Sequence, residues 1–204
     1  MPPKSRLSKP AILAAAVELV RESGPDALNA RALAQRLGCS TQPIFSNYAS
    51  MEALRAGVIA AALERYHQYL AQSIASGKYP PYKASGMAYI RFALEEKELF
   101  KLLFMRDRSG ETIGEDLEEV GPIIALIREK TGMSFERARL FHLEMWLYVH
   151  GIAAMLATNY LPWTMEDISG FLTDAFEGLR MRFEALPPEN PPSPSATPPF
   201  SRGA

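Results

Sequence analysis

Residues 29–48 read NARALAQRLGCSTQPIFSNY, which has the pattern of two short amphipathic helices around a tight turn. Asn29 is expected to cap a first helix over residues 30–37, which the following glycine ends. Ser40 is expected to cap a second helix over residues 41–47. A helix-turn-helix has this layout and places its second helix in the major groove of DNA. The residues alone leave one alternative open, a small helical bundle with arginines on its wet face.

The polar side chains of this stretch are candidates for contact with DNA. Arg31 and Arg36 lie opposite the apolar face of the first helix and are expected to support binding electrostatically. Ser40, Thr41 and Gln42 stand at the start of the second helix, where side chains approach base edges. An amide can bind adenine with two hydrogen bonds, so Gln42 is predicted to read a base.

The charge distribution favours a polyanionic partner at the N-terminal end. Residues 1–48 carry six Lys or Arg and three Asp or Glu, a balance of +3, so the remaining 156 residues carry −4 to give the total of −1. Lys4 and Arg6 are expected to form a basic arm that supports DNA binding. An asymmetry of a few charges also arises by chance, and that alternative stays open.

Helical periodicity extends over most of the chain, without an alternating strand pattern. We expect an all-α, nine-helix, two-domain architecture, with further helices over residues 9–23, 51–76, 82–96, 98–107, 115–130, 134–160 and 164–186. The predicted domains are residues 1–50, a helix-turn-helix domain, and residues 51–186, a helical body. Residues 187–204 hold seven of the sixteen prolines and are expected to form an extended, mobile tail.

Several classes of protein are excluded or disfavoured by composition. The one cysteine, Cys39, excludes an internal disulfide and a cysteine-based zinc site. The three histidines are too scattered for a metal site, and neither a nucleophile elbow nor a phosphate-binding glycine loop is present. No apolar run reaches the roughly 18 residues that span a bilayer. We therefore expect a soluble, cytoplasmic, non-enzymatic protein with no cofactor, metal ion or membrane partner.

Two segments resemble a known family. Residues 9–54 resemble the DNA-binding domain of TetR/AcrR-type transcriptional regulators, through a first helix that ends at Gly24, Arg31-Ala-Leu-Ala34, Leu37-Gly-Cys-Ser40, Ile44-Phe45, Tyr48 and Leu54. Residues 87–151 look like the C-terminal domain of regulators that contain a WHG domain, through Met87-Ala-Tyr-Ile-Arg-Phe-Ala-Leu94, Glu98-Leu-Phe100, Trp146 and His150-Gly151. The resemblance implies a homodimeric regulator, usually a repressor, that leaves its operator when a small ligand binds.

Four positions depart from the family pattern. Phe45, Asn47, Tyr48 and Met51 stand where the family commonly has Tyr, His, Phe and Lys. Phe45 and Met51 cannot contact phosphates as Tyr and Lys do, whereas Asn47 and Tyr48 still carry hydrogen-bond donors. The resemblance and the pattern together give the candidate DNA-binding residues Arg31, Arg36, Ser40, Thr41, Gln42, Asn47 and Tyr48.

Aromatic and methionine side chains concentrate between residues 89 and 155, as they do in cores and in apolar ligand cavities. The predicted effector is therefore apolar or aromatic, and its candidate contacts are Tyr89, Phe92, Phe104, His142, Trp146 and His150. For His150 the alternative is a core histidine bonded to a backbone carbonyl. The run Glu95–Glu98 is interpreted as a solvated helix junction.

The last two predicted helices carry small and apolar residues that favour close approach of a second copy. We expect a two-fold, four-helix interface formed by Gly151, Ala154, Thr158, Phe171, Ala175, Gly178 and Leu179. Two other classes of function remain open from the residues alone. One is an all-helical enzyme, disfavoured because no catalytic constellation is present, and the other is an adaptor that binds proteins through its basic end and Pro-rich tail.

Overall fold

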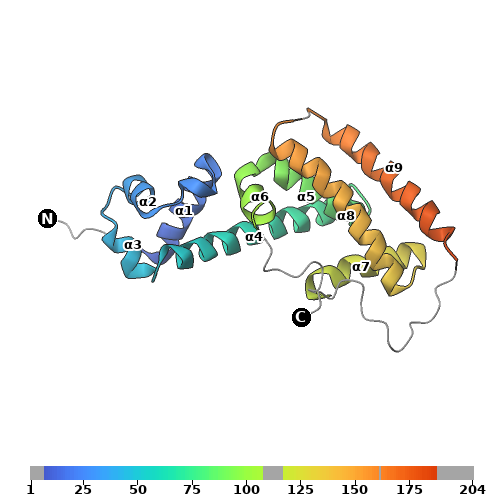
Figure 1. Ribbon diagram of the computed structural model, residues 1–204, viewed down its shortest axis with the longest axis horizontal. Helices are drawn as coiled ribbons and strands as arrows, with labels where there is room; N and C mark the ends of the chain where they lie inside the picture. The colour runs from blue at the N-terminus through green and yellow to red at the C-terminus, as the bar shows by residue number, and fades with distance from the viewer. Residues whose placement is uncertain (1–6, 108–116, 161, 188–204) are drawn as a thin grey trace.

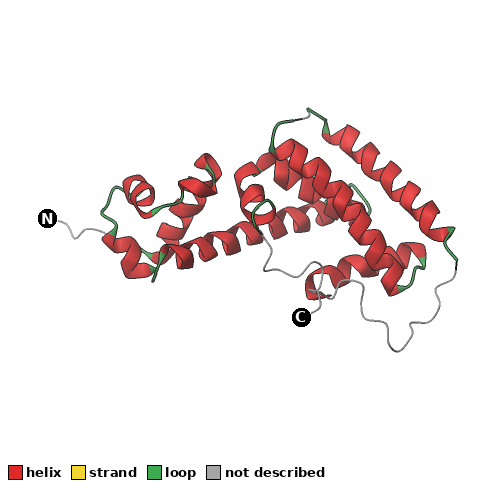
Figure 2. Ribbon diagram, viewed as in Figure 1, coloured by secondary structure: helices red, strands yellow, loops and turns green. Residues whose placement is uncertain are grey.

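The computed structural model describes residues 7–107, 117–160 and 162–187. Over these ranges the protein contains nine α-helices, one 3-10 turn and no strand, which confirms the all-α prediction (Figures 1 and 2). Lys4 and Arg6, the start of the helix predicted from residue 115, and the tail beyond residue 187 lie outside the described residues.

Three helices and a short turn make up the N-terminal part, namely α1 (Lys9–Ser23), η1 (Pro25–Ala27), α2 (Ala30–Arg36) and α3 (Gln42–Asn47). The hydroxyl of Ser8 caps α1 by accepting from the amide of Ala11, and Gly24 ends it with a φ of 83°. The side chain of Asn29 caps α2, as predicted. The sequence pattern did not indicate η1.

The predicted cap of the helix after the turn was wrong. Thr41, not Ser40, occupies the N-cap position of α3, and no side chain accepts a hydrogen bond there. The second residue of α3 is Pro43, which has no amide hydrogen, and the amide of Ile44 already donates to the carbonyl of Thr41. A capping side chain therefore has no donor to serve.

The body consists of α4 (Met51–Ala75), α5 (Pro81–Glu95), α6 (Lys97–Phe104), α7 (Leu117–Thr131), α8 (Phe135–Ala157) and α9 (Met165–Glu184). Figure 1 shows α4 running from the three N-terminal helices into the body, where α5 packs against α4 and α8. Thr164 and Asp167 form the predicted capping box at the start of α9. Helix α4, the longest helix, thus connects the N-terminal helices to the body.

Buried side chains form two clusters. The larger one joins Ile12 and Leu33 of the N-terminal helices to Leu54 and Val58 of α4 and to much of α5, α6 and α8. The smaller one joins α7 to parts of α8 and α9 around Phe141. The predicted domain division between residues 50 and 51 stays a prediction. Helix α4 lies on the body side of this division and shares the larger buried cluster with the N-terminal helices.

The predicted solvated junction at Glu95–Glu98 is wrong for one residue. Glu96, between α5 and α6, is only 5% exposed. Its carboxylate accepts from the Nε and Nη2 of Arg21 on α1 at 2.7 and 3.0 Å, and from the Nε of Arg65 on α4 at 2.6 Å. This triad of Glu96, Arg21 and Arg65 therefore ties α1 and α4 to the α5–α6 junction.

Candidate nucleic-acid interface and sensing core

Helix α3 has one face turned to solvent and one turned to the core. Gln42, Phe45 and Ser46 are exposed, whereas Ile44 and Tyr48 are buried. The hydroxyl of Ser46 donates to the carbonyl of Gln42 at 2.9 Å. The amide of Gln42 and the ring of Phe45 are therefore large groups that α3 offers to a partner.

Two of the candidate DNA-binding residues hold α3 in place. The Nδ2 of Asn47 donates to the carbonyls of Pro43 and Leu7, at 2.8 and 3.4 Å. The hydroxyl of Tyr48 donates to the carbonyl of Lys9 at 3.3 Å, and burial raises the pKa of Tyr48. These bonds connect α3 to the start of α1, and Asn47 keeps only its side-chain carbonyl as an uncommitted polar atom.

The remaining candidates differ in how accessible they are. Ser40 and Arg31 are exposed, and Thr41 is half-buried. Arg36 is exposed and forms two hydrogen bonds with Glu22, at 2.6 and 2.8 Å, which lower the pKa of that carboxyl. Met51, where the family pattern commonly has Lys, packs against the larger buried cluster. Lysine at this position would supply charge instead of apolar packing.

Five of the six predicted effector contacts belong to one aromatic group. Tyr89 and Phe92 of α5 are buried, and the ring of Phe104 lies 4.9 Å from that of Tyr89. The hydroxyl of Tyr89 is 2.9 Å from the Nδ1 of His150, and Trp146 stacks on His150 with centroids 5.1 Å apart. The partner of the Nδ1 of His150 is thus the hydroxyl of Tyr89, whereas the alternative interpretation of this histidine expected a backbone carbonyl.

Sequence reasoning missed Tyr66 of α4, which lies at the centre of this group. Its ring is 5.6–5.8 Å from those of Tyr89, Phe92 and Phe104. The signal was present in the sequence, because Tyr66 continues the buried i+4 series of Leu54, Val58 and Ala62 in α4. Through Tyr66 the aromatic group includes α4, the helix that connects the three N-terminal helices to the body.

His142 lies apart from the other five residues. Its Nδ1 is 3.2 Å from the hydroxyl of Tyr82, which packs against the smaller buried cluster with Phe141 and Phe176. Burial lowers the pKa of His142 to about 4, so the ring is neutral near pH 7. The structure therefore separates His142 from the group around His150.

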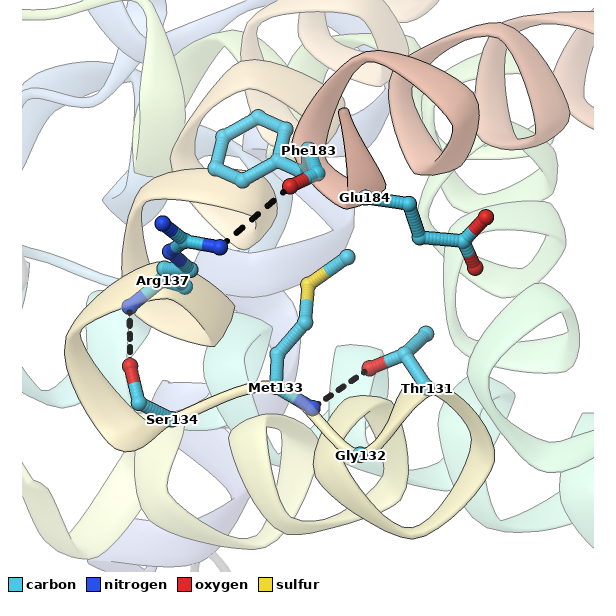
Figure 3. Close-up of a pocket in the computed structure, with 7 residues that line it drawn as sticks. All are labelled: Thr131, Gly132, Met133, Ser134, Arg137, Phe183 and Glu184. Carbon is cyan, nitrogen blue, oxygen red and sulfur yellow. Dashed lines mark hydrogen bonds between the residues drawn. The ribbon is translucent and has the colours of Figure 1, made fainter. Parts of the chain in front are cut away.

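Two open hollows lie away from this aromatic group. One, of about 220 Å³, is formed where α7, α8 and the end of α9 meet, and Figure 3 shows that hydrogen bonds tie its own walls together, from Arg137 to Ser134 and Phe183 and from Met133 to Thr131. The other, of about 630 Å³, lies between α1 and the α5–α6 junction and is lined mostly by charged residues. None of the predicted effector contacts lines either hollow.

The fold and the exposed face of α3 define a class, that of helix-turn-helix DNA-binding proteins with a helical body. Two family models match the chain in the corresponding order. Residues 12–64 match the model described as bacterial regulatory proteins, tetR family, and residues 82–179 match the tetracyclin repressor-like C-terminal domain. The chain belongs to the TetR family and is a DNA-binding transcriptional regulator. The finer WHG name is not part of either description and stays a prediction.

Solved structures share this fold at low sequence identity. A protein of unknown function from Rhodococcus sp. RHA1 has a TM-score of 0.65 and 21% identity, over 89% of this chain and 98% of that one. A protein from Vibrio parahaemolyticus described as a TetR-family regulator has a TM-score of 0.59 and 15% identity, over 83% and 97%. A protein from Pseudomonas aeruginosa PAO1 described as a transcriptional regulator has a TM-score of 0.62 and 17% identity, over 85% and 90%. A comparison with curated proteins gave no match.

Proposed function

We propose that this regulator is a cytoplasmic repressor that binds its operator as a homodimer and leaves it when an apolar or aromatic small molecule enters the body. The dimer is inferred from a stripe of exposed apolar residues on α8. Leu147, Tyr148 and Met155 are exposed and, with Gly151, follow one another at helical spacing. Leu140 is exposed two turns before Leu147, on the other side of Glu144, which pairs with Arg182 of α9. Leu147 leaves 58% of its surface in solvent.

The neighbouring surface of α9 is flat enough for a second helix to approach. A Cβ atom added to Gly151 of α8, or to Gly170 or Gly178 of α9, would meet nothing within 4 Å in one protomer. Met181 of α9 is 66% exposed beside them. In contrast, the predicted contacts Phe171, Ala175 and Leu179 pack partly against the core of their own chain. The proposed interface is therefore centred on the α8 stripe and on the glycine side of α9.

Contact of α8 both with the core of its own chain and with a second copy would account for its high hydropathy. The helix is long and apolar enough to cross a membrane by length and composition, since an 18-residue window of it has a mean hydropathy of 1.3. It buries Phe141, Met145 and Ile152 against α5, α7 and α9, and the exposed stripe lies on the adjacent face. A core face beside an interface face would give the helix a wide apolar surface.

Dimerisation would also supply a second copy of α3 for contact with DNA. Helix α3 is only six residues long, so one copy can reach few base pairs. A two-fold dimer places two such helices on half-sites about 34–36 Å apart, or a multiple of that distance. The operator is therefore expected to be palindromic.

The aromatic group around Tyr66 and His150 supplies the proposed sensing site. A ligand that enters there must move side chains of α4, α5, α6 and α8, because these rings contact one another. A shift of α4 would change the spacing of the two α3 helices and weaken binding, typically by about 1–3 kcal/mol. Differential affinity of the ligand for the two conformations sets the size of this effect.

A shift assay combined with thermal unfolding tests the proposal. The full chain is titrated into a selected palindromic duplex and a scrambled one over a salt series, with and without a panel of apolar aromatic compounds. Specific binding with a steep salt slope, and at least one compound that raises the melting temperature and releases the duplex, are the expected results.

Trp146→Ala should weaken the response to that compound while leaving affinity for the duplex without it nearly unchanged. The other tryptophan, Trp163, contacts Phe171 instead, so Trp163→Ala is the matched control. If no compound stabilises the protein or displaces DNA, the sensing half of the proposal is wrong.

A further inference from the structure

Phe45 stands out on the surface of the DNA-reading end. Within residues 7–73 it is the one large apolar side chain that the structure leaves exposed, at 49%. The other large apolar residue of α3, Ile44, is completely buried. An aromatic ring held half in water on the helix that faces DNA would gain free energy by contact with an apolar group of the partner.

The chemistry of α3 restricts what it can read. Its residues are QPIFSN, and none of them is charged. The commonest specific contact to guanine uses Arg or Lys, so α3 itself cannot make it. The groups that it does offer are the amide of Gln42, which matches adenine, and the ring of Phe45. In the major groove the matching apolar group is the C5-methyl of thymine.

The spacing of the two side chains fits neighbouring base pairs. Gln42 and Phe45 are three residues apart on the exposed face, which is about 4.5 Å along a helix axis. Successive base pairs are separated by about 3.4 Å. We propose that Phe45 determines sequence specificity by packing on the C5-methyl of a thymine, next to an adenine that Gln42 reads. This inference rests on the docking of α3 in the major groove and adds a rule for the operator, an A·T pair at two adjacent positions of each half-site.

Removal of single methyl groups from the DNA tests the inference directly. A duplex is first selected from a random pool with the full-length wild-type chain, and each symmetry-related pair of thymines is then replaced by deoxyuridine. One methyl group corresponds to about a fourfold change in affinity, so one pair of replacements should weaken wild-type binding about 15-fold. 5-Methylcytosine paired with guanine at the same positions should bind more tightly than cytosine paired with guanine, because it restores the methyl group.

Variants of α3 separate this contact from other effects. Phe45→Ala should bind the thymine and deoxyuridine duplexes equally, and it should fold normally because the ring is exposed. Gln42→Ala should keep the response to the methyl group and lose the preference for adenine at the neighbouring position. Ile74→Ala, an exposed apolar residue at the far end of α4, is the matched control and should respond like the wild type.

Three results would overturn the inference, and they differ in whether they also reject the proposed repressor. Specific binding by the wild type with no loss at any deoxyuridine pair rejects the role of Phe45 and leaves the proposed repressor intact. Absence of specific binding to any duplex at low salt rejects the proposed docking of α3 together with the role of Phe45. Equal loss for wild type and Phe45→Ala assigns the methyl contact to another residue.

Discussion

His142 and His150 lie two turns apart on α8 and each contacts a tyrosine of α5, yet they sit in different clusters. His142 packs with Tyr82 beside the second core cluster, where desolvation disfavours its charged form. His150 lies among Tyr89, Phe100 and Trp146. A shared helical face therefore does not give the two imidazoles a shared site.

The burial of His142 makes folding stability depend on pH. Its pKa falls from the ordinary value of 6.5 to about 4 in the folded chain, so the unfolded chain binds more protons between these values. Stability then rises with pH across that window and is lost as pH falls through it, by roughly 2–3 kcal/mol. Urea unfolding at pH 7 and pH 4.5 should show a smaller loss for His142→Gln than for wild type. His67→Gln, at an exposed position of α4, is the control, and parallel curves for all three proteins would contradict the assignment.

At the scale of single elements, the starts of helices were more predictable than their ends, since α6 ends at Phe104 and α8 at Ala157, each three residues before the predicted end. Ser8, Asn29 and Thr164 cap the helices that follow them because each has a free amide two or three positions on. Ser40 is not a cap because α3 begins one residue later than predicted, with Thr41 at the N-cap position. Local sequence therefore predicted helix starts where a polar side chain found a free amide two or three positions on.

Long-range partners could not be predicted in the same way. Glu96 pairs with residues 75 and 31 positions away in the chain, which no local pattern can indicate. The aromatic composition predicted a group around Tyr89 and His150, but not that His142 would join another cluster. What sequence missed was the choice of contact across elements.

Glu96→Gln tests the tie between α1, α4 and the α5–α6 junction. The amide keeps the size of the side chain but removes the charge that two guanidinium groups contact, so unfolding should require about 2–3 kcal/mol less. The neighbouring Glu95 pairs with Arg91 at the surface, and Glu95→Gln should cost less than about 1 kcal/mol. Equal effects of the two variants in urea unfolding would show that burial does not increase the contribution of Glu96 to the free energy of unfolding.

At the scale of the whole molecule, the exposed stripe of α8 predicts how two copies assemble. Leu147→Arg places a charge in the middle of the proposed interface, and Gly151→Trp fills the space left for close approach. Both variants should sediment as monomers at micromolar concentration and bind the operator weakly, since each half-site then acts alone. Ile74→Arg, on an exposed apolar residue outside the stripe, should remain dimeric. A monomeric wild type under these conditions would reject the interface.

The triad at Glu96 also limits how freely this protein could exchange parts with its relatives. Arg21 belongs to the DNA-reading helices, whereas Glu96 and Arg65 belong to the body. A chimaera that fuses this reader to a foreign body at residue 50 keeps the guanidinium but carries its carboxylate partner only if the new body has an acid at the same junction. Designers of hybrid sensors built from this chain would therefore need to transplant the α5–α6 junction together with the reader, or to replace both charges by apolar residues of similar volume.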